Sequence, residues 1–129
     1  MGRATDLSWN PVCRDDGDMS DLARVHDGLA VAAALTGESR FIELGDWGSM
    51  TWEVYAPRGH DPQQPHDRDE VYVVIAGSAT LLIEGRAYPV SVGSGAFVAA
   101  GEQHRFVDVS DDFVTWVVFA GERRGGQHA

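Results

Sequence analysis

One stretch of the 129-residue chain decides the expected fold: QPHDRDEVYVVIAG, residues 64–77. Its second half, Val71 to Ile75, is a nearly continuous apolar run that Gly77 closes. Such a run is typical of a strand that is covered on both faces. The stretch therefore predicts a strand within a layered or closed β structure.

The first half of the same stretch places an imidazole and a carboxylate four residues apart, at His66 and Glu70. Both groups are good ligands for a divalent metal ion. Four fully extended residues span ~13 Å, which is too far for two ligands of one ion. We therefore expect residues 67–69 to turn, as Asp-rich triplets readily do, with His66 ending one strand and Glu70 beginning the next. Asp67 and Arg68 are then expected to be exposed turn residues.

A second histidine stands in a similar position, at the end of GSGAFVAAGEQH, residues 93–104. A short strand enters, a Gly-bearing turn reverses the chain, and His104 opens the next strand. With the right parity, its imidazole faces the same interior as Glu70.

Short apolar runs separated by glycine-bearing turns fill most of the remaining chain. Eight strands at ~8–12-residue spacing favour an all-β sandwich or barrel. The predicted strands are 41–44, 50–56, 71–75, 79–84, 88–92, 96–99, 106–109 and 113–119. A short N-terminal helix is expected before them, capped by Ser20 and extending to Leu35.

The expected organisation is a single domain over residues 19–120, with a flexible arm at 1–18 and a disordered tail at 121–129. Several strands are apolar on both faces, so one face needs cover from a second sheet, the helix or another subunit. We therefore expect a homodimer.

The charge balance limits the classes of partner. The formal net charge is −10, from 10 basic and 20 acidic residues, which disfavours nucleic acid and anionic membrane surfaces. There is no apolar run of ~18 residues and no signal-like start, and Cys13 is the single cysteine. The sequence predicts a cytoplasmic protein with a small-molecule ligand.

The two stretches resemble the paired motifs of the cupin superfamily, specifically its small single-domain "cupin 2" type. The family's first motif has a glycine, two histidines one residue apart, a glutamate and a glycine. The corresponding residues are Gly59, Gln64, His66, Glu70 and Gly77. The second motif corresponds to Gly93, Ala99, Gly101, His104 and Asp108, where the family has Pro and Asn at the second and last places. The resemblance covers about residues 40–120 and implies a small cupin-type antiparallel β-barrel, jelly-roll-like, with a metal held by His66, Glu70 and His104.

Gln64 is the main departure, because it stands where the family has its first histidine. An amide oxygen binds hard ions but is a weaker ligand than imidazole for zinc, nickel or iron. Gln64 is thus an optional fourth ligand, and His60 of the neighbouring loop is an alternative. The ion is one divalent transition metal, with Fe, Mn, Ni and Zn all left open.

Strand parity suggests the walls of the cavity. If Glu70 points inward, so do Tyr72, Val74 and Ala76, and Phe106 follows His104. The expected cavity is small and aromatic-lined, with Tyr72 as the candidate catalytic residue. Two functions stay open: a metal-dependent dioxygenase, isomerase or lyase acting on a small polar substrate, and a non-catalytic module that binds or senses a small ligand or metal.

Overall fold

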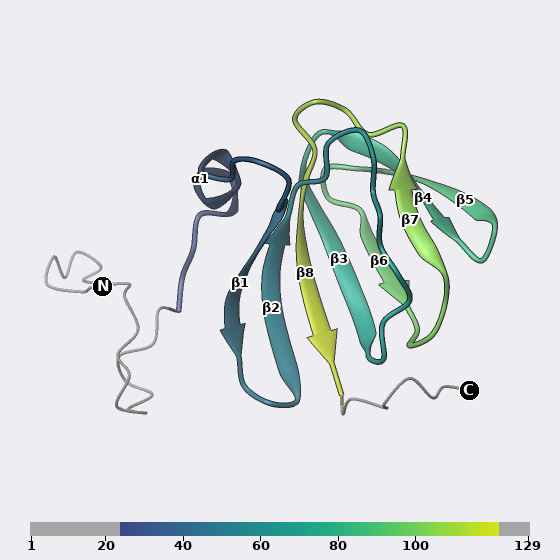
Figure 1. Cartoon of the computed structure of the whole chain (residues 1–129), viewed down its shortest axis with the longest axis horizontal. Helices are drawn as coiled ribbons and strands as arrows, with labels where there is room; N and C mark the ends of the chain where they lie inside the picture. Colours follow the sequence, from purple (N-terminus) through teal and green to yellow (C-terminus); the bar gives the residue numbers. More distant parts are fainter. Residues whose placement is uncertain (1–23, 122–129) are drawn as a thin grey trace, which may run out of the picture.

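The computed structural model describes residues 24–121 (Figure 1). The predicted arm at 1–18, the Ser20 cap and residues 122–129 of the predicted tail lie outside these residues. The elements in chain order are α1 (Gly28–Ala33), β1 (Phe41–Asp46), β2 (Met50–Tyr55), β3 (Asp69–Ala76), β4 (Ser78–Ile83), β5 (Arg86–Ser91), β6 (Gly95–Val98), β7 (His104–Val107) and β8 (Val114–Ala120).

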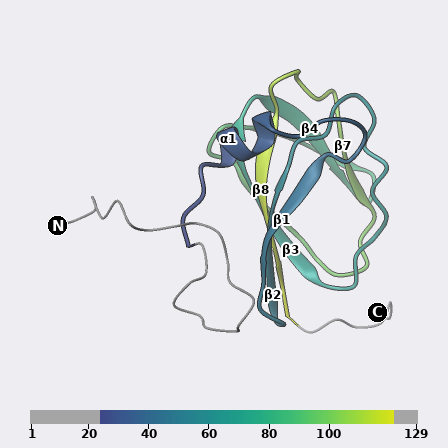
Figure 2. The same ribbon diagram turned by 60° about the vertical axis from the view of Figure 1, so that its left-hand side comes forward.

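The strands form two sheets that face each other (Figure 2). The larger sheet has the order β1-β2-β8-β3-β6, and the smaller one has the order β5-β4-β7. Every strand pair is antiparallel. The all-β architecture is therefore confirmed, and the strands begin and end within about two residues of the predicted positions.

The main core lies between the sheets and is built from the inward residues of alternating strands. In β3, Tyr72 and Val74 are buried whereas Val71 and Val73 are about 40% exposed, so the period of two holds. Phe106 of β7 is 1% exposed and meets Tyr72 edge-on at 4.9 Å. The predicted inward parity is thus confirmed at these positions.

The helix is shorter than predicted and begins later. Residues 24–27 are not helical, and Asp27 is the N-cap, whose carboxylate accepts hydrogen bonds from the amides of Leu29 and Ala30. Gly28 is the first helical residue rather than an interior one. A Cβ at Gly28 would lie 2.6 Å from the side chain of Ile75, so glycine lets α1 approach the outer face of the larger sheet.

The outer face of the larger sheet is only partly covered. A second apolar cluster joins Ala32 of α1 to Val54 and Val114 of the sheet, but Val71, Val73 and Phe97 stay exposed. Cover of this region by a second subunit remains a prediction. Within residues 24–121, no helix is long and apolar enough to cross a membrane.

Candidate metal centre

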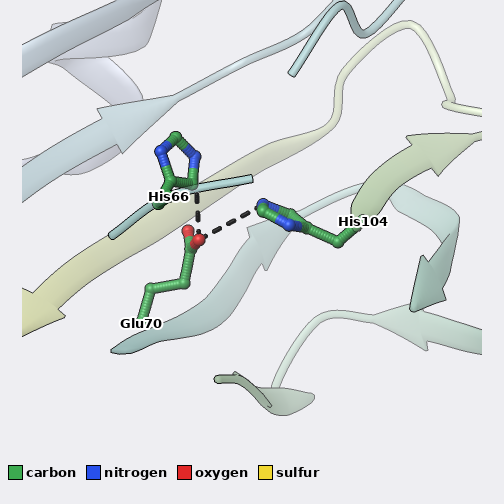
Figure 3. Close-up of side chains that lie close together, drawn as sticks. All are labelled: His66, Glu70 and His104. Atoms are coloured by element: carbon green, nitrogen blue, oxygen red, sulfur yellow. Dashed lines mark ion pairs between the residues drawn. The ribbon is translucent and has the colours of Figure 1, made fainter. Parts of the chain in front are cut away.

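Three predicted ligands meet at one point between the two sheets. One donor atom from each of His66, Glu70 and His104 lies within 4.8 Å of the other two (Figure 3). The Oε1 atom of Glu70 is 3.2 Å from Nε2 of His104 and 3.7 Å from Nε2 of His66. The structure thus assembles a two-histidine, one-carboxylate group of the kind that holds a divalent ion.

Each of these residues comes from a different element. Glu70 is the second residue of β3, and His104 is the first residue of β7 in the opposite sheet. The chain bends at residues 67–68, as predicted, but His66 does not end a strand; it lies in the irregular segment before the bend. Its carbonyl oxygen accepts a hydrogen bond of 2.8 Å from the amide of Gly101, which fixes this segment against the turn before β7.

Buried polar atoms without partners mark the centre of the cluster. Both carboxylate oxygens of Glu70 and Nε2 of His104 are buried and have no hydrogen-bond partner among the described residues. Glu70 is 1% exposed, and a buried carboxylate is strongly unfavourable unless a cation or hydrogen-bond donors compensate its charge. A cation between these atoms would satisfy all of them, so the residues present fit a metal ion.

Hydrogen bonding also prepares the His104 ring for ligation. Its Nδ1 lies 3.0 Å from the carbonyl oxygen of Glu102. A carbonyl can only accept, so Nδ1 carries the proton and the neutral ring presents the lone pair of Nε2 to the cluster. This backbone contact therefore selects the tautomer that a metal ligand needs.

The two imidazoles have opposite pKa shifts. Burial lowers the pKa of His66, although the charge of Glu70 opposes the shift. Burial also lowers the pKa of His104, but the Glu70 carboxylate and the Glu102 carbonyl outweigh it and raise the pKa overall. The His66 ring is consequently favoured in its neutral, metal-binding form near neutral pH. The His104 ring holds a proton more tightly and must lose it before Nε2 can bind a cation.

Gln63, rather than Gln64, reaches the cluster. Gln64 is exposed and does not line the cavity. The Nε2 atom of Gln63 donates to Asp61 (3.0 Å), which turns its Oε1 atom toward Nε2 of His66 (3.2 Å) and the hydroxyl of Tyr72 (3.2 Å). The structure thus places Gln63, and not Gln64, beside the cluster, while Gln64 as a metal ligand stays a prediction.

Asp61 is a second residue that sequence reasoning missed. It is 4% exposed, and its carboxylate accepts hydrogen bonds from the amide of Phe106 (2.7 Å), from Gln63 and from the hydroxyl of Tyr55. Asp61 links the loop to both sheets and holds the Gln63 amide in its orientation. Its only signal in the sequence is its place in a proline-rich loop beside the motif, which distinguishes it poorly from a surface residue.

Tyr72 lies beside the cluster with a firmly neutral hydroxyl. Its side chain is 1% exposed, and its ring centroid is 6.3 Å from that of His104. Burial and the nearby charge of Glu70 raise the pKa of the Tyr72 phenol well above its usual value. Tyr72 can therefore donate a hydrogen bond but cannot act as a base.

Arg68 is buried, which overturns its prediction as an exposed turn residue. It is 2% exposed, and its guanidinium donates to Thr51 Oγ1 (2.8 Å), the Gly48 carbonyl (3.0 Å) and the Gly121 carbonyl (3.1 Å). The planar guanidinium directs several N–H donors in different directions, so one Arg side chain can satisfy three acceptors at this position. Arg68 thus connects the bend between His66 and Glu70 to the β1–β2 hairpin and to Gly121, the residue after β8. Gly121 therefore contacts the folded domain, although the tail was predicted to begin there.

A cavity of about 870 Å³ opens beside the cluster. It is larger and more charged than predicted, because its lining includes charged side chains of β1, β2 and the preceding loop. His60 lines it from an exposed position but is not in the metal-binding group. The carboxylates in the lining are Glu38, Glu43, Glu53, Asp67 and Glu70, and the guanidinium groups are Arg40, Arg58 and Arg68.

Comparison with known proteins agrees with this geometry. Residues 51–120, more than half of the chain, match the Cupin domain family. The chain belongs to the cupin family. Its solved structural neighbours include a protein of Thermus thermophilus, with a TM-score of 0.64 and 22% identity over 76% of this chain and 97% of that one. An RmlC-like cupin with a double-stranded β-helix fold from Methanocaldococcus jannaschii has a TM-score of 0.59 and 17% identity, and covers 69% of this cupin and 86% of its own chain.

Two further relatives complete the comparison. KdgF from Halomonas sp. superposes with a TM-score of 0.56 and 18% identity, over 67% of this cupin and 82% of that chain. An uncharacterised protein of Streptomyces coelicolor is 40% identical over 60 residues, which is 46% of this cupin. The match spans 57% of the length of that relative. At these levels of identity the solved neighbours establish the shared fold.

Proposed function

We propose that this cupin holds one divalent transition metal through His66, Glu70 and His104 and acts as a metal-dependent enzyme on a small molecule bound in the adjoining cavity. The observation that carries the proposal is the set of buried donor atoms without partners, both oxygens of Glu70 and Nε2 of His104. They converge on one point, with the carboxylate 3.2 Å from one imidazole.

Gln63 supplies the fourth position of this proposed site. Its Oε1 atom is 3.2 Å from Nε2 of His66 and accepts from the Tyr72 hydroxyl, so this amide oxygen lies next to the proposed ligands. Asp61 holds the amide nitrogen away from the site. An amide in place of an imidazole lowers the affinity for zinc and nickel relative to hard ions such as Mn²⁺.

The chain's own groups define what the site can do with a ligand. A bound divalent ion would supply Lewis-acid polarisation of a carbonyl or hydroxyl oxygen. Tyr72 donates a hydrogen bond from a neutral phenol, Phe119 packs edge-on against His66 at 5.0 Å, and the two sheets exclude water from the buried side. This arrangement orients a small polar molecule against the cluster and supports proton-transfer chemistry of the isomerase or lyase type.

The test compares metal binding by the untagged protein with binding by a matched pair of loop variants. Elemental analysis and competition titration with Mn²⁺ and Zn²⁺ should give one ion per chain. His104→Ala should abolish stoichiometric binding. Gln63→Ala should weaken it by roughly 10–100-fold, the range for removing a supporting group, while Gln64→Ala should leave it unchanged.

Two outcomes would refute the proposal. No transition metal above trace, with none taken up on dialysis, would exclude the metal site. Equal binding by the wild type and His104→Ala would show that the ligands are different. A metal-binding protein that turns over no small hydroxylated or carbonyl compound in a screen would instead be the non-catalytic binding module.

A further inference from the structure

Two carboxylates face each other on the wall of the cavity, away from the proposed metal ligands. Glu43 of β1 is the register partner of Glu53 of β2, and both line the cavity. Directly opposed residues on one face of an antiparallel pair have Cβ atoms ~4.5–5.5 Å apart. Glu43 is exposed and Glu53 is partly buried, so the repulsion between the two charges favours the protonated form of Glu53.

The same wall connects this pair to the metal cluster. Glu53 pairs with Val117 of β8, and Val117 pairs with Tyr72 of β3, so these residues form one row across the sheet. Glu70, buried and without a hydrogen-bond partner, lies in the adjacent row and lines the same cavity. The carboxylate pair and the proposed metal centre therefore share one wall of the cavity.

The surroundings of Glu53 allow its carboxyl group to gain and lose a proton near neutral pH. Burial, together with the charges of Glu43 and Glu70, raises the pKa of Glu53 to about 7. Carboxylic acids with such values are effective general acids and bases at neutral pH. The titratable and charged groups that line the same cavity as Glu53 are Glu38, Arg40, Glu43, Tyr55, Arg58, His60, His66, Asp67, Arg68, Glu70 and Tyr72.

The charge of the cavity points to the class of ligand. Five carboxylates line it against three guanidinium groups, and each of these three groups already donates to backbone carbonyl oxygens. Away from the metal centre, an anionic ligand would therefore meet more carboxylates than guanidinium groups. A neutral molecule that bears a hydroxyl group meets no such barrier.

We propose that Glu53 is the proton acceptor for a neutral, hydroxyl-bearing ligand that binds in this cavity. The ligand O–H bond breaks, its electron pair stays on the ligand oxygen, and the proton forms a bond to the Glu53 carboxylate. The cation of the proposed function would balance the new negative charge on the ligand, so this inference rests on that proposal. Glu43 is the positioning partner that keeps Glu53 basic enough to take the proton.

The first experiment needs no metal and no substrate. Carbon-13 NMR of carboxyl-labelled glutamates in the metal-free protein, with the Glu53 signal assigned through Glu53→Gln, should show Glu53 titrating near pH 7. Glu43→Gln should move that midpoint toward the ordinary glutamate value of 4.5. A midpoint close to 4.5 in the wild type, or no shift in Glu43→Gln, would overturn the role of the pair.

The second experiment counts protons with catechol as the probe. Calorimetric titration of the zinc-loaded protein, in two buffers of different ionisation enthalpy, gives the protons released per catechol bound. At pH 8 the Glu53→Gln variant should release roughly one proton and the wild type less than half of one, because the negative charge on the bound catechol raises the pKa of Glu53 further and Glu53 then retains the proton. At pH 6 Glu53 is already protonated, so both proteins should release the same number.

The outcomes separate this inference from the proposed function. Equal proton release by both proteins at pH 8, or benzoate binding more tightly than catechol, would overturn the inference while leaving the metal site intact. Failure of the protein to take up either Zn²⁺ or Mn²⁺ would instead refute the proposed function, and the NMR titration would still decide the behaviour of Glu53.

Discussion

Arg68 should be essential for stability, although its acidic neighbours in the sequence predict an exposed turn. We consider Arg68→Met, which keeps the length and apolar stem of the side chain and removes every donor. The structure gives three hydrogen bonds to lose, to Thr51 Oγ1, the Gly48 carbonyl and the Gly121 carbonyl. Thr51 is 3% exposed, so its oxygen is largely shielded from water, whereas the exposed glycines can be rehydrated.

The expected cost follows from these different environments. Leaving one buried acceptor unpaired costs ~1–3 kcal/mol, and each rehydrated carbonyl loses ~0.5–1.5 kcal/mol of net stabilisation. Removal of a buried charge returns part of its desolvation penalty. We therefore expect Arg68→Met to lower the free energy of unfolding by about 2–4 kcal/mol.

Urea unfolding followed by tryptophan fluorescence measures this value, with an unchanged slope required for the comparison. Arg86→Met, at an exposed position of β5, is the matched control and should change stability by less than about 0.5 kcal/mol. A loss below about 1 kcal/mol in Arg68→Met would refute the assignment of Arg68 as the anchor of the bend. The same variant should bind metal roughly tenfold more weakly, because the bend carries both His66 and Glu70.

Three further changes test other parts of the structure. Gly77→Ala should destabilise the fold by about 2–4 kcal/mol in thermal unfolding, because φ is +73° and a Cβ would lie 2.8 Å from the Phe113 Cα. The control Gly93→Ala has a similar φ of +92° but open space around the new Cβ, and should cost about 1 kcal/mol. Equal losses would contradict this. The pKa of Glu53 is raised in the folded state, so the stability of the wild type falls as the pH rises from about 4.5 to 7. Glu53→Gln lacks this titration, so between pH 5 and pH 8 its free energy of unfolding should improve by about 1 kcal/mol relative to the wild type. The same pH dependence in both proteins would count against this. Asp61→Ala should weaken Mn²⁺ binding at least tenfold in a competition titration, since the Gln63 amide loses its support; unchanged affinity would show that Gln63 needs none.

The fold could be predicted because its signals are local and periodic. The apolar run at residues 71–75 and the glycine-bearing turns indicated the strands, and strand parity placed Tyr72 and Phe106 in the core. The spacing of His66, Glu70 and His104 led to the cluster that the structure assembles. Each of these inferences needed only the neighbouring residues and the regular geometry of a strand.

The rest depended on contacts between distant segments. The acidic neighbours of Arg68 suggest solvent, and only the return of β8 and the β1–β2 hairpin shows that carbonyls surround it. Gln63 and Gln64 are adjacent amides in a loop without a period, so nothing local says which of them faces inward. The helix start was also misplaced, because Asp27 and Ser20 are both acceptable caps and the packing of Gly28 against the sheet selects the former.

The two faces of β3 have a consequence for how this protein can change over generations. The strand presents Glu70 and Tyr72 to the cavity and Val71 and Val73 to the outside. A one-residue insertion within it would exchange these faces, placing valines in the cavity and a carboxylate on the surface. Insertions in β3 are therefore tolerable only in pairs, whereas a single residue inserted at the exposed positions 64–65 would leave Asp61 and Gln63 in place ahead of His66. Natural variation in the chemistry of this site is thus expected to enter through the loop.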